Sequence, residues 1–116
     1  MPRVFVTLLL LVFSALAADP DLTGTWNVTV KVTKEQTVTA VWVLRQDDMR
    51  LTGTYRANEA DGTLVGTATH SRAIIRYTQS GTEYLLTGDI LSAGRIEGSV
   101  RIKGDPKGFF HASRAQ

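Results

Sequence analysis

Hydrophobic and polar residues alternate along most of this chain, with a period of two rather than the period of a helix. Alternation of this kind is typical of a β-strand that has one buried face. In the first such segment, the inner face would carry Trp26, Val28, Val30 and Val32. The pattern predicts eight strands, over residues 25–32, 37–45, 51–56, 63–70, 73–78, 83–91, 95–103 and 109–113.

Short turn sequences separate the later strands: NEADG at 58–62, QSGT at 79–82, SAG at 92–94 and GDPKG at 104–108. Asn, Asp and Gly suit turns because they form local hydrogen bonds or tolerate positive φ. Eight short strands at this spacing predict an all-β fold, and short connections favour pairing between neighbours in sequence. We therefore expect an eight-stranded antiparallel up-and-down (meander) barrel, whose closure removes exposed edges. A two-sheet sandwich is the alternative.

One glycine pattern recurs through the predicted strands: LTGTW (22–26), LTGTY (51–55), LVGTA (64–68), LTGDI (86–90) and IEGSV (96–100). The aliphatic residue and the glycine share a face, so Gly53 points inward if Leu51 does. Glycine weakens a strand, but it permits the sharp coiling that a narrow barrel needs. We expect these glycines to serve curvature and to leave room beside Trp26 and Tyr55. The alternative is that they open a ligand cavity.

LTGTW, one β segment and then LTGTY resemble the first three strands of the avidin family. More broadly, the chain resembles small secreted calycin-type, lipocalin-like barrels. Avidins bind biotin with a polar residue two positions after the tryptophan and a serine two positions after the tyrosine. Those positions here are Val28 and Ala57, no tryptophan follows Trp42, and only Tyr55 carries over. The resemblance implies the barrel and argues against tight biotin binding.

The aromatic residues on the predicted inner face form the candidate ligand pocket. They are Trp26, Trp42, Tyr55, Tyr77 and Tyr84. Eight-stranded barrels are either just filled by side chains or hold one small ligand, and the sequence leaves both open. The leading function is non-catalytic binding of a small apolar or aromatic molecule in the barrel mouth.

A second set of apolar residues falls on the predicted outer face: Val41, Val43, Val65, Ile74 and Leu85. A strand that is apolar on both faces is usually covered on both. Val65, Ile74 and Leu85 fall on neighbouring strands and are expected to form one patch, unless the patch is too small to matter. This predicts self-association or a protein partner. The alternative function is therefore a protein-binding, inhibitor or accessory module, and a third is a purely structural envelope protein.

The N-terminus reads as a secretory signal. Arg3, an apolar run over residues 4–16 and the small residues around Ala17 fit the three parts of such a signal. The run is shorter than the roughly 20 residues of a membrane-spanning helix, although an uncleaved anchor is the alternative. We expect a signal peptide over 1–17 and one barrel domain over 18–116, secreted or periplasmic and free of the membrane after cleavage. With no cysteine in the chain, no disulfide is available.

Charge and catalytic signatures narrow the function further. Removal of Arg3 leaves 12 basic and 11 acidic side chains, and their scatter argues against nucleic-acid binding. No nucleophile elbow, phosphate-binding loop or zinc-protease sequence occurs, so we expect no enzyme and no cofactor. Asp47 and Asp48 read as a solvated turn. His70 and His111, expected inward near strand ends, are too few for a zinc site.

Overall fold

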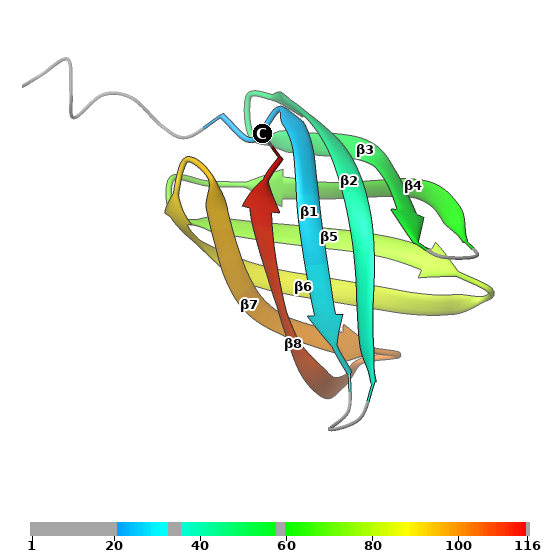
Figure 1. Ribbon diagram of the computed structural model, residues 1–116. Helices are drawn as coiled ribbons and strands as arrows, with labels where there is room; N and C mark the ends of the chain where they lie inside the picture. The colour runs from blue at the N-terminus through cyan, green and yellow to red at the C-terminus, as the bar shows by residue number, and fades with distance from the viewer. Residues whose placement is uncertain (1–20, 33–35, 58–59, 116) are drawn as a thin grey trace, which may run out of the picture.

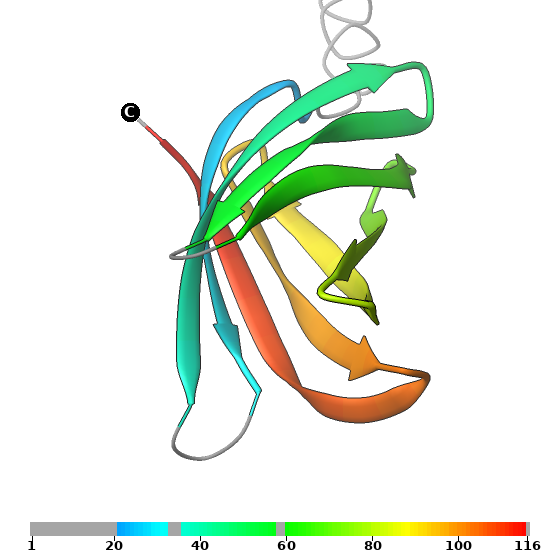
Figure 2. The ribbon, with the colours of Figure 1, turned by 90° about the vertical axis from the view of Figure 1, so that its right-hand side faces the viewer.

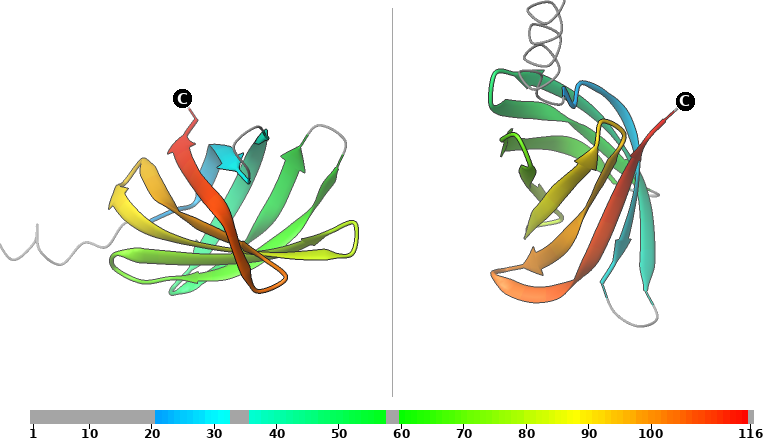
Figure 3. Two further views of the ribbon diagram at one scale, coloured as in Figure 1. Left: turned by 90° about the horizontal axis from the view of Figure 1, so that it is seen from below. Right: turned by 90° about the vertical axis from the view of Figure 1, so that its left-hand side faces the viewer.

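The computed structural model describes residues 21–32, 36–57 and 60–115. Eight strands form: β1 (Gly24–Lys31), β2 (Thr37–Asp47), β3 (Arg50–Ala57), β4 (Asp61–Ala68), β5 (Arg72–Gln79), β6 (Thr82–Ser92), β7 (Arg95–Ile102) and β8 (Asp105–Arg114). Each pairs antiparallel with the next, and β8 pairs with β1 to close the barrel (Figure 1; the right-hand view of Figure 3 shows β1 and β8 side by side). The predicted meander barrel is confirmed. The predicted signal peptide lies outside the described residues.

Several predicted strand boundaries are wrong, and those of β8 and β4 matter most. β8 begins at Asp105 and not at residue 109, because Lys103 and Gly104 form the whole turn with φ values of 54° and 85°. The irregular register between Val100 and Arg101 then accommodates Pro106, which has no backbone N–H to donate. β4 likewise begins at Asp61, inside the sequence expected to be a turn, and ends at Ala68.

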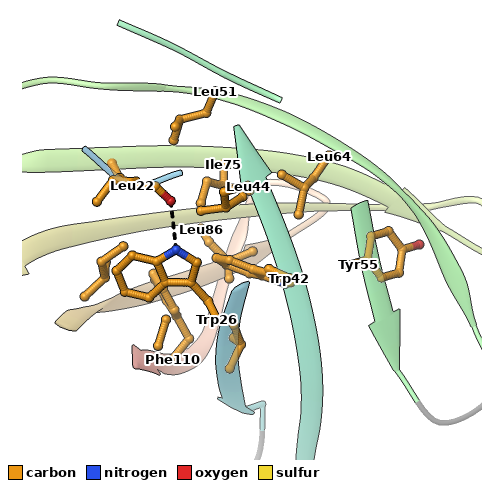
Figure 4. Packing of buried hydrophobic residues seen from close by; sticks show 14 of the residues in the cluster. Leu22, Trp26, Trp42, Leu44, Leu51, Tyr55, Leu64, Ile75, Leu86 and Phe110 are labelled. Atoms are coloured by element: carbon orange, nitrogen blue, oxygen red, sulfur yellow. Dashed lines mark hydrogen bonds between the residues drawn. The ribbon is translucent and has the colours of Figure 1, made fainter. Parts of the chain in front are cut away.

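The inner faces of all eight strands meet in one apolar core. Trp26, Trp42, Leu44, Leu86 and Phe110 are among its largest members (Figure 4). No charged or polar residue is buried among the described ones. Burial of apolar side chains therefore holds the barrel together, since no disulfide is available. In the described part of the chain, no helix is long and apolar enough to span a membrane.

Glycines mark places where one strand crosses close over the inner face of its neighbour. A Cβ atom at four of them would collide with a backbone carbonyl oxygen of an adjacent strand. The pairs are Gly53 with Val43, Gly66 with Ile74, Gly98 with Thr87 and Gly108 with Lys31. Any side chain would push these strands apart, so the recurring glycines permit the tight coiling of the wall. The expectation that Gly53 points inward is confirmed, whereas its role in curvature stays a prediction.

One junction in the wall is incomplete. β4 and β5 pair only through Val65–Ala68 and Ala73–Arg76, whereas β5 and β6 pair over eight positions. The two strands diverge from their connecting loop (Figure 2). We call the unpaired stretch, residues 61–64 of β4 facing 77–79 of β5, the β4–β5 seam.

Candidate functional site

All five aromatic residues of the predicted pocket lie on the inner face, but they differ in burial and do not gather at one end of the barrel. Trp26, Trp42 and Tyr55 are buried, and they occupy one register row across β1, β2 and β3. Tyr77 and Tyr84 are half-buried and face each other across β5 and β6. Trp26 lies near the start of β1, and the three tyrosines lie near the opposite end, by the turns that follow β3 and β5.

The tryptophan end of the barrel is closed by the segment that precedes β1. Leu22 is fully buried, and its carbonyl oxygen accepts a hydrogen bond from Nε1 of Trp26 at 2.9 Å (Figure 4). The backbone N–H of Leu22 donates to Oε1 of Gln46, also at 2.9 Å. The one polar atom of the indole is therefore already bonded within the protein.

Arg114 completes this closure from the last residue of β8. Its guanidinium lies 4.6 Å from the centroid of the Trp26 ring, a cation–π contact. It also donates hydrogen bonds of 2.7 to 3.1 Å to the backbone carbonyl oxygens of Asp21, Thr23 and Ala93. Gly24 makes room for it, because a Cβ atom there would lie 2.7 Å from the guanidinium. The glycine of LTGTW thus admits an arginine rather than a ligand.

At the other end, Tyr55, Tyr77 and Tyr84 form a tyrosine cluster. The ring centroids of Tyr55 and Tyr77 are 4.6 Å apart with a tilt of 39°, and those of Tyr77 and Tyr84 are 5.0 Å apart and stacked within 12°. These separations lie in the range that aromatic pairs prefer. In Figure 4 the Tyr55 ring lies apart from the Trp26–Trp42 group, with its hydroxyl pointing away from it.

Tyr55 also bridges the β4–β5 seam from inside. Its hydroxyl donates to the carbonyl oxygen of Thr78 at 3.3 Å. If the ladder continued, Thr63 would lie opposite Thr78, two positions beyond the last pair of Val65 and Arg76, but the two strands do not pair there. The side chain therefore stands in for a missing strand bond. Gly62 lies opposite Tyr55, where a Cβ atom would come within 2.9 Å of the ring.

The other two phenols are available for hydrogen bonding. Neither Tyr77 nor Tyr84 donates to or accepts from another described residue, and no buried side-chain polar atom is left unsatisfied among those residues. Burial, followed by the neighbouring Tyr84 and Tyr55, raises the pKa of Tyr77. Burial, followed by the charge of Asp61, raises the pKa of Tyr55. Tyr77 therefore stays neutral at pH 7 and can donate a hydrogen bond.

Sequence reasoning missed Gly62, Thr78 and Arg114. Gly62 carries a usable signal, because a glycine near the start of a strand and opposite an inward tyrosine leaves space for the ring. Thr78 contributes only a backbone carbonyl, and Arg114 reaches Trp26 through β1–β8 pairing over almost the whole chain. Neither leaves a local pattern in the sequence.

The outer-face candidates are only partly exposed. Val41, Val43 and Val65 are 40%, 49% and 54% exposed, whereas Ile74 and Leu85 are half-buried. Arg76 lies opposite both Val65 and Leu85 in the register, so a guanidinium interrupts the expected apolar patch.

The polar candidates do not assemble into a site. His111 points outward and is exposed, because Phe110 and Ala112 take the inner positions of β8, so the inward expectation is wrong for it. His70 is exposed in the loop after β4. Asp47 ends β2, and Asp48 occupies the following turn with a φ of 59°. The described residues contain no group of three acidic or histidine side chains that could hold a metal ion.

Comparison with known proteins shows similarity in fold. A redesigned beta barrel, b11L5F_LGL, superposes with a TM-score of 0.70 at 14% identity, over 82% of this chain and 92% of that chain. A second redesigned beta barrel, mFAP1 bound to DFHBI, superposes with a TM-score of 0.62 at 16% identity, over 81% and 94% of the two chains. No protein-family model matches the chain, and no curated protein matches it. At these identities the likeness shows the barrel fold alone.

Proposed function

We propose that this protein binds a small planar aromatic or apolar molecule at the mouth of the barrel, against the tyrosine cluster, without catalysing a reaction. The observation that carries the proposal is the contrast between the inner aromatics. The Trp26 indole has every polar atom bonded, whereas Tyr77 and Tyr84 are half-buried with phenols that no described residue engages.

The chemistry of the cluster suits such a ligand. A planar ring can extend the stack on Tyr84, and stacking on an aromatic side chain contributes roughly 1–3 kcal/mol. Neutral phenols can donate to or accept from a polar group at the rim of that ring. The similar barrel mFAP1 was solved with DFHBI bound, which supports a barrel of this size as a host for one small molecule.

DFHBI provides a direct probe of the proposal through its fluorescence on titration with the protein. We expect saturable binding that Tyr84→Ala weakens about tenfold, because one stacked ring is lost. Phe109→Ala is the matched control, since Phe109 is an aromatic residue that is 72% exposed on the outer face. It should leave binding unchanged. Absence of saturable binding, or equal losses in the two variants, would refute the proposal.

A second candidate, a protein-binding or self-associating outer face, rests on the exposure of Val41, Val43 and Val65. Monomeric proteins seldom expose large contiguous apolar patches. If this face mediates association, sedimentation will show an oligomer that the double variant Val43→Lys, Val65→Lys converts to monomer without unfolding. Wild-type protein that sediments as a monomer at high concentration excludes self-association.

We also propose that the chain is exported, on the strength of the predicted signal over residues 1–17. Leu8→Arg places a charge in the apolar run and should block translocation. Recovery of a trimmed Leu8→Arg protein in the exported fraction would disprove the assignment.

A further inference from the structure

A shallow groove on the outside of the barrel combines positive charge with an apolar floor. It has a volume of about 470 Å³ and lies over β3, β4 and β5. Its outward-facing lining consists of Arg50, Thr52, Val65, Thr67, Ile74 and Arg76. We call it the arginine groove. It is separated from the tyrosine cluster by the barrel wall.

The register places two arginines on either side of β4. Arg50 of β3 lies opposite Thr67, and Arg76 of β5 lies opposite Val65. Thr67 and Val65 are two positions apart on the same face of β4, so the two guanidiniums flank a short stretch of one strand. Arginine side chains are long enough to converge above that stretch.

Neither guanidinium has an acidic partner among the described residues. Asp47 lies opposite Arg50 in the register, yet the two form no ion pair. Two other arginines do form ion pairs: Arg72, at the start of β5, with Asp89 at 3.8 Å, and Arg95 of β7 with Glu97 at 3.0 Å. The two arginines of the groove therefore keep their hydrogen-bonding capacity for an external group.

The floor between them is apolar. Val65 is 54% exposed and Ile74 is half-buried, and the hydroxyl-bearing Thr52 and Thr67 border them. Covering exposed apolar surface of this kind with an aliphatic group lowers the free energy, because the surface is removed from water. The groove thus offers two different contacts: the guanidinium groups of Arg50 and Arg76 at its sides, and the apolar side chains of Val65 and Ile74 between them.

We propose that the arginine groove binds a single-chain anionic amphiphile, an alkyl chain that ends in a phosphate group. The phosphate oxygens accept hydrogen bonds from Arg50 and Arg76, whose planar guanidiniums match phosphate geometry. The first carbons of the chain lie on Val65 and Ile74. This site goes beyond the proposed function, because it uses the outer face and none of the tyrosines.

The test is an amide chemical-shift titration with octyl phosphate, kept below its micelle concentration. Inorganic phosphate supplies the head alone and octanol the tail alone. We expect saturable shifts centred on Val65, Thr67 and Ile74, and binding of octyl phosphate about tenfold tighter than that of either fragment, because both contacts are made at once. Arg76→Gln should weaken binding about tenfold, and Val65→Thr about threefold.

Arg95→Gln is the matched control, since it removes an exposed arginine that is already paired with Glu97; it should leave the affinity unchanged. Thermal unfolding of each variant verifies that it folds. Several results would overturn the proposal: equal affinity for phosphate and octyl phosphate, an equal loss in Arg95→Gln, or shifts that cluster on the tyrosines. Binding to anionic vesicles without binding of octyl phosphate would overturn it in favour of a membrane surface.

Discussion

Both ends of this barrel carry inward-facing aromatic residues, but the surroundings of these rings differ. At one end the Trp26 ring lies between a buried leucine backbone and the guanidinium of Arg114, with its indole nitrogen bonded at 2.9 Å. At the other end, three tyrosines pack against one another beside the β4–β5 seam, where the two strands do not pair. Inward aromatic residues alone therefore do not define a pocket.

The difference lies in what covers each ring. At the tryptophan end, the indole and the guanidinium of Arg114 donate to backbone carbonyls of residues 21–23 and of the β6–β7 turn, so these polar groups are satisfied internally. The tyrosine end replaces a strand bond with a side-chain bond of 3.3 Å and leaves two hydroxyls to solvent. The first arrangement favours stability, and the second leaves capacity for a ligand.

Truncating one ring at each end should give the largest contrast. Trp26→Ala removes a fully buried ring and should lower the free energy of unfolding by about 4 kcal/mol. Tyr84→Ala removes a half-buried ring and should cost only about 1 kcal/mol. Urea unfolding at neutral pH measures both. Equal losses would mean that the tyrosine end is as tightly built as the tryptophan end.

Adding one methyl group to the wall should give the next largest effect. A Cβ atom in Gly53→Ala collides with the carbonyl oxygen of Val43, which cannot move without its strand, so we expect a loss of about 3 kcal/mol. In Gly62→Ala the neighbour is the Tyr55 ring, at 2.9 Å. That ring can rotate toward the seam, so the loss should stay near 1 kcal/mol.

Thr52→Val is the control for the glycine pair, because Thr52 is exposed on the outer face beside Gly53 and its substitution should be nearly neutral. A Gly62→Ala loss as large as that of Gly53→Ala would show that the seam is rigid.

A smaller effect is expected from Tyr55→Phe, which keeps the ring and removes only the bond to Thr78. A single part-buried hydrogen bond of this length contributes about 0.5 kcal/mol. The local consequence should be clearer than the global one. Amide exchange at Thr63 and Thr78 should accelerate, because the seam opens more often, while exchange at Trp26 stays unchanged. Unchanged exchange at the seam would contradict its bridging role.

The sequence predicted the fold well because alternation and turn chemistry are local signals. Residues such as Val28 and Val30 reveal the inner face within a few positions, and so do the glycines that share that face. Strand eight was misplaced because Pro106 and Gly108 read as breakers, although a register irregularity accommodates the proline. The five aromatics were assigned to the correct face, but their division into two regions could not be predicted. It depends on Arg114 and on the early end of β4–β5 pairing, which are properties of the closed barrel.

The smallest effect at neutral pH, and one that grows in alkali, concerns the ionisation of Tyr77. Burial raises the pKa of this phenol above its ordinary value near 10, so the folded state holds the proton more tightly than the unfolded state does. The protonated Tyr77 phenol therefore makes its full contribution to stability below pH 10, and that contribution is lost as the pH rises through the pKa of Tyr77 in the folded state. We expect the free energy of unfolding to fall in that range, with the phenolate of Tyr77 appearing only as structure is lost. The variant Tyr77→Phe has no phenol to ionise and should show a shallower decline of stability with pH.

The tryptophan end should lose its structure after the tyrosine end, so ligand binding at the mouth should weaken before tryptophan fluorescence changes. Simultaneous loss of both signals would show that the two ends unfold as one unit, and an unchanged slope in Tyr77→Phe would show that another group governs the alkaline transition.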